Sequence, residues 1–192
     1  MEVNIGRLTL QNMGRGDSGY TDLPGLERVP KYDQRIEAEG TLDEATSALG
    51  LARAAALMPD VRQLLAEMQQ DLYVIMAELA TPPSRRAKLV ARIESADVDR
   101  LEAETHATEE KVQLPTQFIL PGACPASAAL DFSRAVMRRA ERRVAQLVHE
   151  QVVENKETLR YLNRASSLLF VLARYEEASQ GVPFSLTQPR RR

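Results

Sequence analysis

The sequence predicts an all-α protein: a bundle of five helices, mostly running up and down, preceded by an irregular glycine-rich arm. Three observations carry this prediction. Apolar residues recur at helical spacing in five segments, prolines or glycines separate most of these segments, and no segment shows convincing strand alternation. With 192 residues, 44% hydrophobic and 27% charged, the chain is expected to fold as one domain with a sizeable core.

Within this single domain, covering residues 1–192, three regions differ in pattern. Residues 1–32 have no helical period and hold five of the nine glycines, so they are expected to form an arm. Residues 33–181 carry the helical bundle. Residues 182–192 are a short tail that ends in Pro-Arg-Arg-Arg, which is more typical of a solvated end than of a binding motif.

The first helix has two candidate starts. Thr41 to Glu44 reads as a capping box, but helix-compatible residues begin already near Asp33. The pattern favours a helix from about Asp33 to Ala56. The other four helices are expected at about Asp60–Ala80, Ala96–Lys111, Pro125–Gln151 and Asn155–Gln180.

The buried faces are read from the apolar period. The second helix is expected to bury Leu64, Leu65, Met68, Leu72, Ile75, Met76 and Leu79, and the third has only Val98, Leu101 and Ala107. The fourth and fifth helices carry apolar residues on wide arcs, which indicates burial in an oligomer as well as in the core. Between the third and fourth helices, Phe118 and its apolar neighbours lie in a proline-bounded loop and are expected to pack against something.

Composition excludes several classes of protein. The net charge of −2 gives no basic field for nucleic acid, and no stretch has the apolar length of a membrane span or the form of a signal peptide. The single cysteine, Cys124, excludes an internal disulfide and fits a reducing, cytoplasmic location. His106 and His149 are the only histidines, and they are not spaced as a metal-binding pair.

The most informative feature is an arginine-rich stripe within the apolar pattern of the fourth helix. Arg134, Arg138, Glu141 and Arg142 are spaced to share one face. Arginines on a helix that is largely apolar need carboxylates or a ligand's phosphates to satisfy them. Two interpretations stay open: a ligand site, or a network of salt bridges to Glu39, Asp43 or Glu44.

Three further segments are weaker candidates. The glycine-rich Gly16–Thr21 segment allows backbone N–H groups to approach an anion, although a plain turn is the better explanation of this segment taken alone. The segment from Arg28 to Glu37 could grip phosphate at a helix start, or be a solvated set of ion pairs. Asn163 and Arg164 precede an apolar run, where an asparagine often bonds to a neighbour's backbone.

Taken in order, five stretches resemble the PduO-type ATP:cob(I)alamin adenosyltransferases. The stretches begin with Gly-Asp-x-Gly-x-Thr at 16–21 and Gly-x-x-Arg-Val-x-Lys-x-Asp-x-Arg-x-Glu at 25–37, which continues to Asp43-Glu44. Phe-Ile-Leu-Pro-Gly at 118–122, the arginine stripe at 134–142, and Asn163-Arg164 with the run to Tyr175 complete them. The resemblance covers nearly the whole chain, from about Gly16 to Glu177.

The resemblance implies a homotrimer with active sites between subunits, which transfers the 5′-deoxyadenosyl group of ATP to the cobalt of cob(I)alamin and releases triphosphate. ATP, Mg²⁺ on its phosphates and cobalamin are then the expected ligands, with no metal held by the protein alone. A cobalamin reductase and an adenosylcobalamin-dependent enzyme are the expected partners. Cobalt(I) is itself the nucleophile, which agrees with the lack of a catalytic triad or a paired acid and base.

The resemblance also implies roles for single residues. Arg138 acts on the nucleotide, Arg134 pairs with Asp43 across the subunit interface, and Phe118 covers the lower face of the corrin. The residues expected to bind the nucleotide are Arg15, Gly16, Asp17, Gly19, Thr21, Arg28, Lys31, Glu141, Arg142 and Asn163.

Some positions depart from the family pattern. Met13-Gly14-Arg15 replaces a triplet with two hydroxyls, Ser167 replaces a carboxylate near the corrin side, and Asp131 replaces a common histidine. These changes motivate an alternative: a diverged, non-catalytic paralogue that binds or delivers corrinoid or nucleotide.

Overall fold

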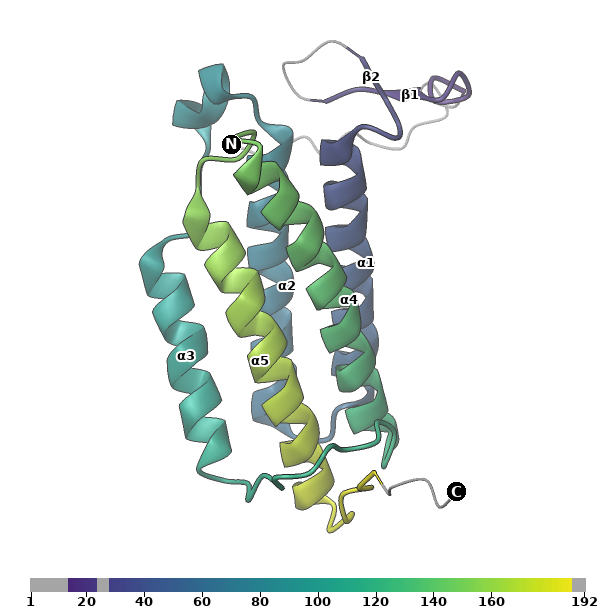
Figure 1. Cartoon of the computed structure of the whole chain (residues 1–192), viewed down its shortest axis with the longest axis vertical. Coiled ribbons are helices and arrows are strands. Elements are labelled where there is room, and N and C mark those ends of the chain that lie inside the picture. The colour runs from purple at the N-terminus through teal and green to yellow at the C-terminus, as the bar shows by residue number, and fades with distance from the viewer. Residues whose placement is uncertain (1–13, 24–27, 188–192) are drawn as a thin grey trace.

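Five α-helices pack side by side into an elongated bundle in the computed structural model, which describes residues 14–23 and 28–187 (Figure 1). Met13, Gly25 and the Pro-Arg-Arg-Arg end, which the sequence analysis singled out, lie outside the described residues. The helices are α1 (Gln34–Ala55), α2 (Pro59–Ala80), α3 (Ser95–Glu109), α4 (Pro125–His149) and α5 (Lys156–Ser179). Each lies within about two residues of its predicted range, so the all-α prediction is confirmed.

Side-chain caps explain where several helices begin. Asp33 is the N-cap of α1, and its carboxylate accepts a hydrogen bond from the backbone N–H of Arg35 at 2.9 Å. Thr41 lies inside the helix and donates its hydroxyl proton to the carbonyl of Glu37. The start near Asp33 is therefore correct, and the alternative capping box at Thr41 is wrong. Asn155 caps α5 in the same way as Asp33.

Three small elements were not predicted from the sequence. A 3-10 helix, η2 (Pro83–Lys88), follows the end of α2, where Pro82 cannot continue the α-helix. In the arm, β1 (Tyr20–Thr21) pairs antiparallel with β2 (Val29–Pro30). These strands are too short to show the alternation by which a strand is recognised in a sequence.

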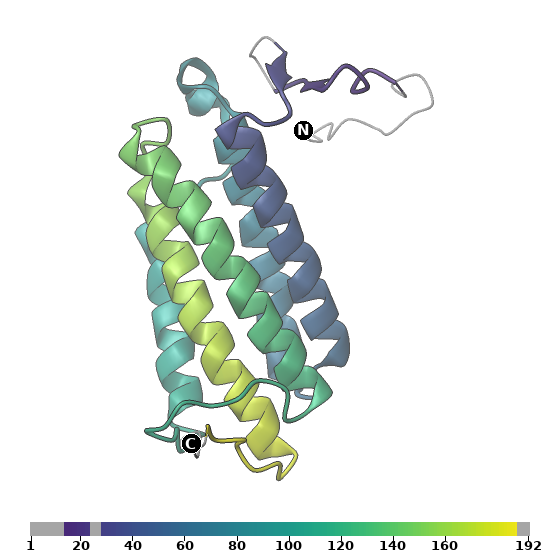
Figure 2. The ribbon, with the colours of Figure 1, turned by 45° about the vertical axis from the view of Figure 1, so that its right-hand side comes forward.

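The core lies between four of the helices, with α4 packed against both α1 and α5 (Figure 2). Helix α3 covers the outer side of α5, and α2 packs against α1. The predicted buried face of α2 is confirmed, except that Leu64 is only partly buried. On α3, Ala107 is exposed and Thr108 is buried in its place. Phe132 on α4 is 56% exposed, so it lies outside the core of the single chain.

Hydropathy separates these helices from membrane spans. In the part of the chain that the structure describes, no helix combines the length and the apolar character needed to cross a bilayer.

Helix α5 also holds the start of α2 in place through a buried carboxylate. Glu176 is fully buried and accepts hydrogen bonds from the backbone N–H groups of Leu57 and Met58, at 3.0 and 3.1 Å. These donors precede a helix that begins with Pro59 and has no side-chain cap of its own. A carboxylate at this end also interacts favourably with the helix dipole.

Replacing this carboxylate should destabilise the bundle. We expect Glu176→Ala to lower the free energy of unfolding by about 2–4 kcal/mol, because two backbone N–H groups at the start of α2 lose a charged, buried acceptor. Urea unfolding followed by circular dichroism measures the change. The matched control is Glu110→Ala, an exposed glutamate after α3, which should stay within about 0.5 kcal/mol of the wild type. Equal effects of the two substitutions would contradict the role of Glu176.

Candidate functional site

In the described part of the arm, residues 14–23 and 28–32, the cationic side chains lie close to a turn. Gly14 and Gly19 adopt positive φ angles, +87° and +77°, which a residue with a side chain rarely takes. The guanidinium of Arg28 donates to the carbonyls of Arg15 and Tyr20, and both Arg15 and Arg28 pair with Asp22. The hydrogen bonds and ion pairs of Arg28 therefore hold residues 15, 20 and 22 together near the start of α1.

Lys31 lies directly over the backbone of Gly16. A Cβ atom placed on Gly16 would be 2.9 Å from the Lys31 Nζ atom, closer than real contacts allow. The N–H of Lys31 also bonds to the carbonyl of Gly19 at 2.8 Å, which fixes the chain at this point. The absence of a side chain at Gly16 thus lets an ammonium group and a backbone turn meet, as an anion cradle requires. Asp17 is exposed beside them and Thr21 lies on β1.

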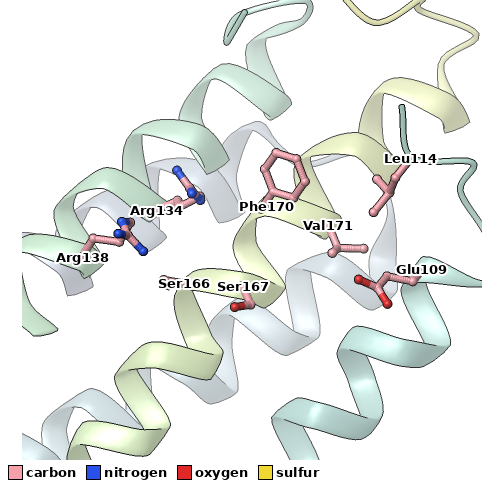
Figure 3. A pocket seen from close by; sticks show the side chains of 8 residues that line it. All are labelled: Glu109, Leu114, Arg134, Arg138, Ser166, Ser167, Phe170 and Val171. Atoms are coloured by element: carbon pink, nitrogen blue, oxygen red, sulfur yellow. The ribbon is translucent and has the colours of Figure 1, made fainter. Parts of the chain in front are cut away.

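A second site is a pocket of about 200 Å³ between α3, α4 and α5 (Figure 3). Arg134 and Arg138, one turn apart on α4, form its cationic side. Its apolar wall is contributed by Phe170 and Val171 of α5 and by Leu114. Ser166, Ser167 and Glu109 complete the lining. Spacing of three to four residues on each helix brings these side chains to one place.

The arginines of the predicted stripe differ in their partners. The Arg142 guanidinium folds back onto the carbonyl of Arg138 at 2.9 Å, so Arg142 does not enter the pocket. Among the described residues, no carboxylate lies within salt-bridge distance of Arg134 or Arg138. Their guanidinium groups are therefore available to a ligand or to another chain.

A salt-bridge network does join α1 to α4, but through other arginines. Arg139 pairs with Glu44, and Arg143 pairs with Glu37 at 3.1 Å. These pairs hold the two antiparallel helices in register. Asp43 is exposed on α1 beside this network, while Arg134 lies more than one turn further along α4. The predicted salt bridges between the first and fourth helices therefore exist, and Glu44 is one of the predicted partners. Their arginines are Arg139 and Arg143, and not Arg134, Arg138 or Arg142.

Glu141 and Asn163 form a polar bridge between α4 and α5. The Asn163 amide donates to the Glu141 carboxylate at 2.8 Å, and its oxygen accepts from Arg164 at 2.8 Å. Arg164 also pairs with Glu102 on α3 at 2.6 Å, which holds the pKa of that carboxyl below its usual value. The Asn163 amide therefore bonds to side chains, and not to a neighbour's backbone as its position before an apolar run suggested.

Phe118 is held out into solvent by the C-terminal segment. Ile119 forms an isolated antiparallel bridge with Leu186, and the N–H of Thr187 donates to the Phe118 carbonyl at 2.9 Å. The Phe118 side chain is 85% exposed. The expectation that Phe118 packs against other side chains is thus wrong for the single chain. The contacts of this loop with Leu186 and Thr187 are made by the backbone and leave the Phe118 ring uncovered.

Protein side chains alone do not form a metal site in the described residues. Residues 14–23 and 28–187 contain no cluster of three or more histidine, cysteine, aspartate or glutamate side chains suited to a metal ion. Cys124 is buried at the start of α4, where its Sγ atom accepts from the N–H of Ser127. Both histidines are exposed.

Sequence reasoning missed two residues of the pocket. Glu109 is the last residue of α3, and Leu114 lies in the loop after it. Neither stands out in the sequence, because their role depends on how α3 lies against α5. Phe170 was noted only as part of an apolar run, although its spacing from Ser166 and Ser167 could have placed it on the same face.

An all-helical bundle with an arginine-lined pocket and a cationic glycine loop defines a class of protein suited to phosphorylated and partly apolar ligands. The model of one family, described as cobalamin adenosyltransferase, matches residues 12–176. That match covers most of the sequence. The chain belongs to the cobalamin adenosyltransferase family.

Curated relatives agree with this assignment. The corrinoid adenosyltransferase PduO of Salmonella typhimurium is 40% identical over 163 residues, which are 85% of this chain but 48% of that protein. The chain thus spans about half the length of that relative. A corrinoid adenosyltransferase of Citrobacter freundii is 37% identical over 167 residues, covering 87% of this chain and 94% of that protein.

Solved structures share the fold. A variant of the PduO-type ATP:corrinoid adenosyltransferase from Lactobacillus reuteri, complexed with cobalamin and ATP, superposes with a TM-score of 0.83. It is 31% identical, and the alignment covers 92% of this chain and 98% of that one. A second variant, complexed with ATP, gives a TM-score of 0.80 at 30% identity.

The Glu141–Asn163 bridge can be tested by placing a second carboxylate in it. In Asn163→Asp two carboxylates face each other, and the one nearby cation, Arg164, already pairs with Glu102, so the remaining repulsion raises the pKa of the pair in the folded state. Stability should then fall, relative to the wild type, as the pH rises through that pKa. We expect a loss of about 1 kcal/mol at neutral pH that shrinks near pH 4.5. Urea unfolding at both pH values measures it. Asn163→Ala, which adds no charge, should show no such pH dependence, and the same dependence in both variants would refute the bridge.

Proposed function

We propose that the protein is an ATP:corrinoid adenosyltransferase that transfers the 5′-deoxyadenosyl group of ATP to the cobalt of cob(I)alamin. The observation that carries the proposal is the pocket in which Arg134 and Arg138 face an apolar wall, in a chain of this family. Guanidinium groups suit the phosphates of a nucleotide, and the wall formed by Phe170 and Val171 suits a large, flat, mostly apolar ring.

The arm supplies the groups for the triphosphate. Lys31 over Gly16, together with Arg15 and Arg28, gathers positive charge at a turn rich in glycine. Asp17, Gly19 and Thr21 offer a carboxylate, backbone and a hydroxyl to the phosphates and to hydrated Mg²⁺. In this proposal magnesium is held jointly by these groups and the phosphates of ATP.

In the reaction, the lone pair of cobalt(I) forms a bond to C5′ of ATP while the C5′–O bond breaks and triphosphate leaves. The substrate supplies the nucleophile, so the protein needs no general base. Its residues have to orient C5′ toward the cobalt and stabilise the charge on the leaving group. Arg138 and Lys31 suit the second task. Glu141, Asn163 and Arg142 suit the first, as nucleotide-binding groups on α4 and α5.

The pocket of one chain is too small for a corrinoid. At about 200 Å³ it lies below the roughly 300–1,000 Å³ of ordinary small-molecule pockets, and a corrin is larger than most such ligands. Phe118 extends into solvent on a loop at the end of the bundle where α4 begins, and is available to cover the lower face of the ring. We therefore propose that a neighbouring subunit completes the site.

A homotrimer fits the uncovered features of α1 and α4. Leu51 and Phe132 are 58% and 56% exposed, on two helices that pack side by side. Also on α1, burial and the nearby charge of Asp43 raise the pKa of Glu39. Among the described residues, no salt bridge includes either of these two carboxylates. In the proposed trimer, Arg134 of one subunit pairs with Asp43 of the next.

The reaction places further requirements on the surroundings. Cobalt(I) is strongly reduced, so we propose a cytoplasmic location, a cobalamin reductase as the source of the substrate and an adenosylcobalamin-dependent enzyme as its recipient. We also propose that the arm (1–32), the bundle (33–181) and the tail (182–192) act as one domain, because the arm cradles phosphates and the tail holds the Phe118 loop.

An anaerobic absorbance assay tests the activity. Purified protein is mixed with chemically reduced cob(I)alamin, ATP and Mg²⁺, and the loss of the cobalt(I) band is followed. We expect turnover, and a decrease in kcat of about 10²–10³-fold in Arg138→Ala, because a positioned charge on the reacting groups is lost. Arg85→Ala, at an exposed arginine of η2, is the matched control and should turn over normally.

The outcomes separate the two interpretations of the family. Steady turnover that Arg138→Ala loses supports the enzyme. Binding of ATP or cobalamin without turnover would instead support the non-catalytic paralogue that the changes at Met13 and Ser167 suggest. Failure to bind either ligand would refute both.

A charge exchange tests the proposed subunit contact. Arg134→Asp and Asp43→Arg should each place like charges at the interface and weaken assembly, by about 3–5 kcal/mol if the pair is buried there. The double variant should restore it. Sedimentation velocity measures the oligomer. If the single variants sediment as the wild type does, the Arg134–Asp43 contact is refuted.

A further inference from the structure

The Phe170 ring contacts two arginines that have very different surroundings. The Arg134 Cζ atom lies 5.6 Å from the centre of the Phe170 ring, and the Arg174 Cζ atom lies 5.2 Å from it. Arg134 comes from α4 and lines the pocket, whereas Arg174 follows Phe170 by one turn on α5. Figure 3 shows the Phe170 ring beside the Arg134 side chain.

Arg174 is fixed in place by carboxylates. Its side chain is 1% exposed, and its guanidinium donates to Glu177 at 2.9 and 3.0 Å and to Asp131 at 2.6 Å. Asp131 lies on α4, so this buried group ties α4 to α5 beside Phe170. One guanidinium faces two carboxylates, which leaves a net negative charge in a region that excludes water.

Arg134 has no such anchor in its own chain. In residues 14–23 and 28–187, none of the salt bridges includes Arg134, and its cation–π contact is with Phe170. Asp131 lies three residues before it, on the same face of α4. The ring and the negative group together restrict where this guanidinium can lie.

We infer that Phe170 is a positioning residue for Arg134, held in its own orientation by the buried Arg174–Asp131–Glu177 group. The ring attracts the Arg134 guanidinium at cation–π distance, and the excess of carboxylates in the neighbouring Arg174–Asp131–Glu177 group favours a cation near it. Arg134 is thereby directed before any ligand or partner subunit arrives. The catalytic consequence rests on the proposed function, but the directing of Arg134 does not.

This role differs from simple packing. If Phe170 and the buried ion pairs only joined α4 to α5, removing the ring would lower the stability of the bundle but would not change the position of the Arg134 side chain. A positioning role predicts that removing the ring frees Arg134 even when the bundle stays folded. Displacement of a binding or catalytic group by about 1 Å can lower activity by about 10²-fold, so the effect on the reaction can exceed the effect on stability.

The direct test is the NMR signal of the Arg134 Nε–H group, identified by its loss in Arg134→Lys. Because the Phe170 ring shifts nearby protons, we expect this signal to move toward the position of a free arginine in Phe170→Leu and to stay in Phe170→Tyr. Tyr73→Leu, which removes an exposed ring from α2, is the matched control. If Phe170→Leu does not fold, Phe170→Met gives the same readout. An unchanged signal in a folded variant without the ring overturns the inference.

Kinetics then separate this inference from the proposed function. In Phe170→Leu we expect kcat/KM for cob(I)alamin to fall about tenfold. Phe170→Tyr should recover most of that loss. If the Arg134 signal of the wild-type protein differs from that of a free arginine but the protein shows no turnover, the proposed function is refuted and the inference about Phe170 is supported. Normal turnover in Phe170→Leu, or a loss that Phe170→Tyr does not recover, refutes the catalytic consequence, whereas the NMR signal of Arg134 decides whether Phe170 directs this side chain.

Discussion

The packing of α4 against α5 is the constraint on which the rest of the structure depends. The pocket takes its arginines from α4 and most of its apolar wall from α5, so its shape exists only while these helices keep their spacing. Apolar residues supply most of the contact, but two polar links fix the register. Asn163 bonds to Glu141 at one level, and Arg174 bonds to Asp131 at another. A shift of one helix along the other would break both.

Buried charge on α5 serves more than one neighbour. Glu176 binds backbone at the start of α2, while Glu177 and Arg174 face α4. Buried ion pairs often add little net stability compared with apolar residues of similar size, because of the cost of removing charges from water. Their value here is directional. Each of these bonds has a geometry that an apolar contact lacks, and so it sets where the ends and faces of the neighbouring helices lie.

Much of the fold could be predicted because helical period and helix-breaking residues are local signals. Asp33, Pro59 and Pro125 lie at or next to the starts of helices, as their conformational preferences require. The 3-10 helix and the short ribbon in the arm carry no periodic signal, so they could not be found. The exposure of Phe118 was also missed, because an apolar residue in a sequence does not reveal whether its own chain or another one covers it.

The candidate site could also be predicted only in part from the sequence. Arg134 and Arg138 could be identified from spacing on one helix, and the structure places both in the pocket. The separation of Arg142 from them depends on a side-chain rotamer, which sequence spacing does not determine. Glu109 and Leu114 depend on the packing of α3 against α5, a long-range contact. The roles of the residues on the arm remain predictions that follow from family membership and from the position of Lys31 over Gly16.

Cys124 gives the molecule a built-in reporter. It is the only cysteine in the sequence, it is 7% exposed, and it lies at the first turn of α4, two residues after the Phe118 loop ends at Gly122. Its Sγ atom also lies 3.5 Å from the amide of Gln180, just after α5. A thiol reagent can reach this sulfur only when that end of the bundle opens. The rate of labelling of the unmodified protein therefore measures local opening where α4 begins and α5 ends, without any engineered cysteine.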